Sequence, residues 1–294
     1  MQFRLRNPVI YGLMTAALFG CGTPFSKVLL ADVHPLALSS LLYIGSGIGT
    51  LLLFFMLTRD GNGREDREAS LRRGDFPWLA GVIVFGGFLA PLSLMSGLSQ
   101  TPAETAALLL NFEAVATTIL ATFLFHESVG RRIWVALAFV TTACVILSWD
   151  PRALYGVSIP AIGVILSTVF WSMDNNVTRH ISSKDPIVIV ALKGICGGSL
   201  ALAAALLLGV PWPDLPTLLA AMVLGFASFG GLTSMLFIQA LRGIGTARSA
   251  SLLAVSPLFG VTLSLLIFAE VPDLRFFLAT PLMALGVYLL VAER

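Results

Sequence analysis

Long apolar stretches recur from one end of the chain to the other, and they constrain its fold more than any other feature. A stretch of about 17–25 apolar residues spans the hydrocarbon core of a bilayer when it is helical. A transmembrane barrel would instead show ~10-residue segments of alternating polarity, which this sequence lacks. The ten expected helices cover 8–31, 35–58, 76–99, 102–125, 132–149, 155–178, 186–208, 216–240, 246–268 and 273–292.

The composition supports a membrane protein. Of the 294 residues, 57% are hydrophobic and only 12% are charged, and the mean hydropathy is +0.91. A soluble domain is typically about 45–50% apolar and about 25% charged, so a water-soluble globule with this composition would lack polar surface. The same values exclude a disordered chain, a secreted disulfide scaffold and a nucleic-acid-binding domain. Because the spans leave only tails and short loops, we expect an all-α polytopic membrane protein with a single membrane domain.

Basic residues are distributed unequally between the loops. If the N-terminus is cytoplasmic, fourteen of the eighteen Lys and Arg residues fall in inner segments, and only Arg152 and Arg275 fall in outer loops. Cytoplasmic loops of membrane proteins carry an excess of Lys and Arg. The distribution therefore predicts that both termini are cytoplasmic and that the number of spans is even.

The two halves of the chain resemble each other. Residues 98–127 align with residues 241–270 at a constant offset of 143. Each half contains five spans, and an odd number makes two related halves cross the membrane in opposite directions. This pattern predicts inverted repeats related by a pseudo-twofold axis in the membrane plane. We expect the first five-helix repeat at 1–150 and the second at 151–294.

Two stretches resemble the EamA family of the drug/metabolite transporter superfamily. ALFGCGTPFSKVLL (17–30) resembles the family's opening signature, with Lys27 eight residues after the aromatic Phe19. ALRGIGTARSASLLAVSPLFGVTLSLLIFAE (240–270) resembles its closing pattern, with Ser-Pro inside and Glu at the end. The resemblance covers nearly the whole chain, and it implies ten helices in two inverted repeats and metabolite export through the bacterial inner membrane. Size and pattern are most similar to the YddG-type amino-acid exporters of that family.

The sequence departs from the family pattern at two places. Phe19 stands where the family often has Trp. Ala114 stands where the second repeat has Pro257, so we expect the kink of the span at 102–125 to be missing.

Glu113 is the ionisable residue that lies deepest in an expected span. It lies about 16 Å along the axis from either end of the span at 102–125. Intramembrane ionisable residues are costly and are functional candidates by default. One interpretation is that Glu113 binds a cationic group or carries a proton. The other is that a protonated Glu113 hydrogen-bonds Asn111 or a neighbouring helix and holds the bundle together.

Aromatic and neutral polar residues near the middle of the spans complete a candidate binding site. Phe19 and Trp171 are repeat equivalents at an offset of 152, and we expect their rings to flank one central cavity. A pocket for an amino acid needs such apolar faces beside a few polar groups. Helix packing is the alternative role of any one of these side chains. The expected substrate-binding residues are Phe19, Asn111, Glu113, Trp171, Asn175 and Ser256.

Two acid–base couples stand where gates could form. Lys27 and Glu104 lie at the outer mouth, and Asp174 and Arg248 lie at the inner mouth. Because the repeat maps one couple onto the other, we expect each couple to close when its own side is shut. Alternating access needs two states of similar energy, and a charge pair made in only one of them biases that state. The alternative is that the cations extend to the membrane interface while the acids cap helix starts.

Other motifs are sparse. Cys21, Cys144 and Cys196 lie inside spans without a pairing pattern, and the three His residues lack metal-ligand spacing. Two G-x-x-x-G matches, at Gly45/Gly49 and Gly194/Gly198, predict close helix contacts, either within one chain or between two copies. No Walker loop, nucleophile elbow or zincin motif appears, so we expect no cofactor, no metal and no ATPase subunit.

These features predict a secondary transporter rather than an enzyme. We expect it to export small metabolites, above all amino acids including aromatic and large apolar ones, by alternating access. The expected partners are the substrate and the lipid bilayer, with no nucleic acid and no required oligomer. An exporter of drugs or quaternary amines that uses Glu113 is the first alternative. A membrane enzyme or scaffold is a more remote one.

Overall fold

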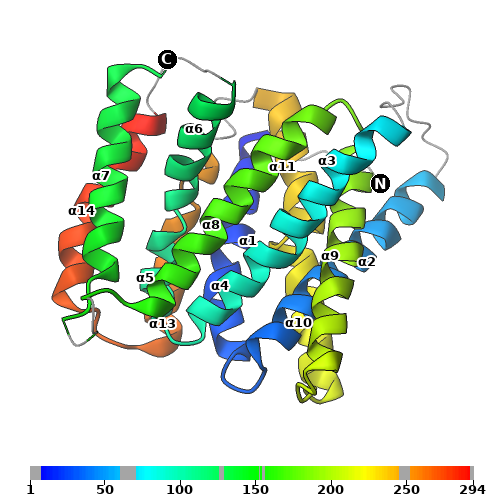
Figure 1. Cartoon of the computed structure of the whole chain (residues 1–294), viewed down its shortest axis with the longest axis horizontal. Coiled ribbons are helices and arrows are strands. Elements are labelled where there is room, and N and C mark those ends of the chain that lie inside the picture. Colours follow the sequence, from blue (N-terminus) through cyan, green and yellow to red (C-terminus); the bar gives the residue numbers. More distant parts are fainter. Residues whose placement is uncertain are drawn as a thin grey trace.

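The computed structural model describes residues 8–59, 71–125, 129–151, 153, 156–244 and 252–291, and they form a bundle of helices (Figure 1). The elements of the first half are α1 (Pro8–Leu29), α2 (Pro35–Arg59), η1 (Arg73–Asp75), α3 (Phe76–Gly81), η2 (Val82–Leu89), α4 (Ala90–Leu98), α5 (Ala103–Leu109), α6 (Phe112–Phe125) and α7 (Arg131–Ser148). Those of the second half are α8 (Ile159–Thr178), η3 (Arg179–Ile181), α9 (Pro186–Leu207), α10 (Leu215–Ser228), α11 (Gly231–Ile244), α13 (Ser256–Phe268) and α14 (Leu274–Val291).

The expected fold class is confirmed. Among the described residues no strand is present, and β structure is limited to an isolated bridge between Trp149 and Val157. Seven helical runs are long and apolar enough to cross a membrane, and α13 and α14 add two shorter apolar helices. The remaining expected span is α8, whose apolar run ends in the polar triplet 174–176. The chain is a polytopic α-helical membrane protein.

Helix contacts follow the two-repeat arrangement. Helix α2 packs on α9, its repeat equivalent, and α7 packs on α14, with this last pair at one edge of the bundle (Figure 1). Helix α1 packs on α11 and α13, while its equivalent α8 packs on α4 and α6. When each helix is replaced by its repeat equivalent, the contacts of α1 with α11 and α13 become the observed contacts of α8 with α4 and α6. A pseudo-twofold relation between the halves requires this correspondence.

Glycines allow α2 and α9 to cross at backbone distance. A Cβ added at Gly194 would lie 2.6 Å from the backbone nitrogen of Gly47, and one at Gly47 would lie 2.6 Å from that of Ile195. Small residues are what lets membrane helices approach so closely. A Cβ at Gly45 or Gly49 would in turn collide with residues of α10. The G-x-x-x-G glycines thus make close helix contacts inside one chain, which confirms the sequence interpretation.

The fourth span is interrupted although it lacks proline, so the expectation of a missing kink was wrong. Helix α5 ends at Leu109 and α6 begins at Phe112. The side chain of Asn111 donates a hydrogen bond to the carbonyl of Leu108 at 3.0 Å. The same carbonyl also accepts the backbone N–H of Asn111 at 3.1 Å, and local side-chain bonds of this kind compete with regular helical hydrogen bonding. In the second repeat the corresponding place is the start of α13, with Pro257 in its first turn.

The third span contains a π-helical segment, η2, immediately before α4. Pro91 lies in the first turn of α4 and cannot donate a backbone hydrogen bond. A π turn is one way in which a helix accommodates such a fault, and π turns are frequent at functional sites. The segment contains Gly86 and Gly87, both of which are packed against charged residues of other helices.

We predict that Gly194→Leu destabilises the protein by about 1–3 kcal/mol or more, because the larger side chain has no room against Gly47. Thermal unfolding in detergent measures the effect. Gly74→Ala is the matched control, since an added Cβ there meets nothing within 4 Å. An unchanged melting temperature for Gly194→Leu would contradict the close crossing of α2 and α9.

Candidate functional site

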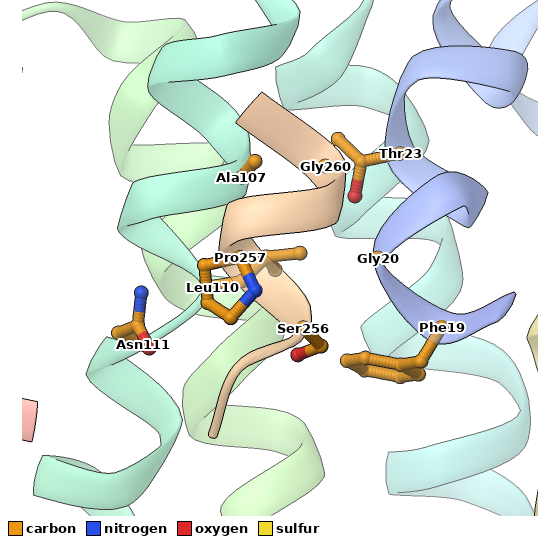
Figure 2. A pocket seen from close by; sticks show the side chains of 9 residues that line it. All are labelled: Phe19, Gly20, Thr23, Ala107, Leu110, Asn111, Ser256, Pro257 and Gly260. Carbon is orange, nitrogen blue, oxygen red and sulfur yellow. The ribbon is translucent and has the colours of Figure 1, made fainter. Parts of the chain in front are cut away.

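A small cavity lies where α1, α5 and α13 meet. Its volume is about 50 Å³, and side chains from all three helices line it (Figure 2). Three of the predicted binding residues, Phe19, Asn111 and Ser256, are among the lining residues. Thr23 and Pro257 also line it, which places apolar and polar groups side by side around one space.

The helices around this cavity are packed as closely as their backbones allow. A Cβ added at Gly20 would collide with the carbonyl oxygen of Ser256, and one at Gly260 would lie 2.9 Å from the carbonyl oxygen of Gly20. The volume of about 50 Å³ holds about one or two water molecules. The enclosed volume is smaller than a whole amino acid, but the pocket is open to its surroundings rather than sealed.

Two interrupted helices start beside this cavity. Helix α6 begins at Phe112, directly after the cavity residue Asn111, and α13 begins with the cavity residue Ser256. Irregular backbone inside a membrane is tolerated where it is buried in protein or lines a cavity. Transporters use discontinuous helices of this kind to build substrate and ion sites.

Glu113 and Asn175 are brought together beyond the break. The amide nitrogen of Asn175 on α8 donates a hydrogen bond to Glu113 Oε1 at 2.7 Å. The hydroxyl of Ser172 donates to the backbone oxygen of Glu113 at 3.1 Å, and Thr117 bonds Ser172 at 3.0 Å. Asn175 is exposed, so this polar contact between α6 and α8 borders the surface rather than the sealed core.

Trp171 is placed in the core and is not among the residues that line the cavity. Its side chain is buried, and its indole N–H donates to the hydroxyl of Tyr43 on α2 at 3.2 Å. Buried Trp side chains usually need such a hydrogen-bond partner. In this conformation Phe19 lines the cavity and its repeat equivalent joins α8 to α2.

Asp174 forms an ion pair with Lys193, a residue to which the sequence pattern assigned no role. Its Oδ2 lies 2.9 Å from the ammonium of Lys193 on α9, and Thr178 donates to its other oxygen at 3.2 Å. Gly86 of η2 packs directly on this carboxylate, where a side chain would collide. The partner expected from the sequence, Arg248, lies outside the described residues. The position of Lys193 in the sequence could have indicated a functional residue, because a cation inside a membrane helix is rare.

The outer couple is not joined by an ion pair. Lys27 donates hydrogen bonds to the carbonyl oxygens of Leu98 and Ser99, at 2.8 and 2.9 Å. These carbonyls belong to the end of α4, where a cation also interacts favourably with the helix dipole. Glu104 is buried in the first turn of α5 and lies within electrostatic reach of Lys27. Lys27 thus caps a neighbouring helix in this conformation.

The chain is similar to known proteins in both sequence and fold. The sequence profile of the EamA-like transporter family matches residues 6–149 and again residues 158–292. A protein of Methanothermobacter thermautotrophicus described as an uncharacterized transporter is 27% identical over 293 residues, which cover 95% of this chain and 84% of that protein. A solved crystal structure shares the fold with a TM-score of 0.65 at 20% identity, and the match covers 96% of this chain and 95% of the other.

These matches point to transport rather than catalysis. The profile accounts for nearly all of the chain, in two successive copies. Together with the apolar helices, they identify a multi-pass membrane protein of the drug/metabolite transporter type. The chain belongs to the EamA-like transporter family.

Proposed function

We propose that this protein exports small metabolites, above all amino acids with aromatic or large apolar side chains. The observation that carries the proposal is the cavity between α1, α5 and α13, where the ring of Phe19 lies beside Ser256 and Asn111 lines the opposite side (Figure 2). Ligand sites commonly combine apolar walls with a few polar groups that orient the ligand. The proposed location is the bacterial inner membrane, with both termini cytoplasmic.

Alternating access is the proposed mechanism. Two structurally related halves can exchange conformations around one central site, as in transporters built from inverted repeats. The small size of the cavity supports this proposal, because a whole amino acid needs more room than its volume of about 50 Å³ provides. The contact of Gly20 with Gly260 leaves no side chain between the backbones of α1 and α13, and packed contacts of this kind switch between discrete arrangements through small rigid-body shifts.

The charged couples are proposed as gates. The buried pair of Asp174 and Lys193 joins α8 to α9 beside the π-helical segment, so a movement of these elements must break or rebuild it. Arg248 is the proposed alternative partner of Asp174, and Glu104 is the proposed alternative partner of Lys27. An ion pair that exists in only one conformation biases the equilibrium between the two.

Cation export is the second candidate function. Glu113 lies near the middle of the fourth span, and its partner Asn175 is exposed. A carboxylate in this position could bind an ammonium or quaternary amine. This function would place the substrate at the contact between α6 and α8 rather than in the cavity.

Liposomes that contain only the purified protein should pass labelled phenylalanine and leucine faster than protein-free liposomes do. The same vesicles should pass the cation ethidium no faster than the protein-free control. Movement of ethidium without any amino acid would reject amino-acid export and favour the cation function. Flux measured with and without a pH gradient will decide between proton antiport and uniport.

Phe19→Ala should reduce the apparent affinity for phenylalanine about tenfold, since the loss of the aromatic face removes about 1–2 kcal/mol of apolar contact. Its melting temperature should fall less than its activity. Phe25→Ala is the matched control on the same helix, because that ring is largely exposed on the outside of the bundle. Equal loss of transport in both variants would argue against Phe19 as a cavity wall.

Asp174→Asn should lower the free energy of unfolding by about 3 kcal/mol, because it leaves the Lys193 cation without its partner. The double variant Asp174→Asn/Lys193→Met should recover most of that stability and still transport poorly. Asp273→Asn, at an exposed ion pair, should behave like the wild-type protein. Unfolding titrations and flux assays on the four proteins test this prediction. A double variant with wild-type transport would exclude a gating role of the pair.

A further inference from the structure

Within the described residues the start of α13 has no side-chain cap, although the N–H of Leu258 already donates to the carbonyl of Val255 at 3.0 Å. Its N-cap residue is Val255, which makes no side-chain capping bond, and the first turn contains no acidic residue. The partial positive charge of a helix N-terminus favours an anion, and carboxylates are stabilised there. This helix is 13 residues long and begins at the cavity, with Ser256 as its first residue.

An unpartnered hydroxyl faces the cavity at this place. Ser256 is only 7% exposed and lines the cavity, and within the described part of the chain no hydrogen bond reaches its hydroxyl. Because this oxygen is open to the cavity, a water molecule or a ligand can supply the partner that such groups normally have. The hydroxyl can donate to an oxygen atom that enters the cavity.

The first repeat carries an acidic residue at the equivalent position, and its carboxylate accepts a hydrogen bond from Asn175 of α8. At the offset of 143, Ser256 corresponds to Glu113, which lies in the first turn of α6. Helix α6 therefore carries an acid at its N-terminus, whereas α13 carries a neutral hydroxyl that faces the cavity. Helix α6 thus has a negative charge near its N-terminus, whereas α13 has none there and can bind an anion.

We propose that the N-terminus of α13, with the hydroxyl of Ser256, binds the carboxylate of the transported amino acid. This inference rests on the proposed function and specifies how its substrate is recognised. The cavity has room for a carboxylate group, while the rest of the substrate extends through its open side. The substrate class is then α-amino acids and related monocarboxylates, and amines without a carboxylate are excluded.

Competition against labelled phenylalanine in proteoliposomes tests the carboxylate site. The competitors are phenylalanine, 3-phenylpropionate, phenylalaninamide and phenethylamine, which retain or lose the carboxylate and the amine separately. We expect the two carboxylates to compete and the amide and the amine to bind at least about tenfold more weakly, since hydrogen bonds to a charged group are the stronger ones.

Two variants assign the effect to Ser256. Ser256→Ala should weaken binding of phenylalanine about tenfold and leave the amide unchanged, so that the preference for the carboxylate is reduced. Ser256→Thr keeps the hydroxyl and should keep the preference. Ser264→Ala is the control on the same helix, because that buried hydroxyl already bonds the Gly260 carbonyl at 2.7 Å. It should retain wild-type preference.

The possible outcomes distinguish a failure of the proposed carboxylate site from a failure of the proposed amino-acid export. If phenylalanine is transported but phenylalaninamide competes equally well, the carboxylate site is wrong and amino-acid export stands. The same conclusion follows if Ser256→Ala keeps the full preference. If Ser256→Ala does not fold, the comparison of acid and amide on the wild-type protein decides. If no amino acid is transported, both proposals fail.

Discussion

Backbone groups inside a membrane must find hydrogen-bond partners within the protein, and this requirement governs the centre of the bundle. Two helices are interrupted there, at Leu110–Asn111 and at the start of α13. Hydrocarbon could not satisfy the freed carbonyl and amide groups, so these breaks persist only where protein or a cavity surrounds them. At the first break the backbone closes short bonds from Glu113 to Leu110 and from Ala114 to Asn111, and the cavity lies beside both breaks. The interruptions and the cavity are therefore two aspects of one arrangement.

Glycine contacts explain how such a centre can be both tightly packed and able to change. At Gly20, Gly47 and Gly194, neighbouring backbones approach each other without intervening side chains. Closely packed interfaces of this kind resist gradual deformation. They change by switching between discrete arrangements. The buried pair of Asp174 and Lys193 adds an electrostatic contact to the same region of the bundle. Its net contribution depends on geometry, because desolvation opposes the attraction between the charges.

The sequence alone predicted the helical spans well, since an apolar run of bilayer length has few other solutions. It also predicted the internal glycine contacts, whose four-residue spacing places both residues on one helix face. It did not predict the break at Asn111, because proline was the signal sought and the break contains no proline. It missed Lys193 as the partner of Asp174, because the two residues lie on different helices and their distance follows from tertiary packing. Trp171 shows the same limit: its place in the repeat suggested a cavity wall, and its hydrogen bond to Tyr43 holds it in the core.

The central claim is that the cavity between α1, α5 and α13 is a substrate site reached alternately from the two sides of the membrane. Ala107 lines this cavity, so Ala107→Cys in a chain whose three native cysteines are replaced provides a reporter. The measurement is its reaction with an impermeant thiol reagent in right-side-out and inverted vesicles. The account predicts reaction from both sides, and protection by phenylalanine in both. The buried Ala136→Cys, away from the cavity, should not react. Reaction from one side only, or reaction that phenylalanine does not slow, would contradict the account.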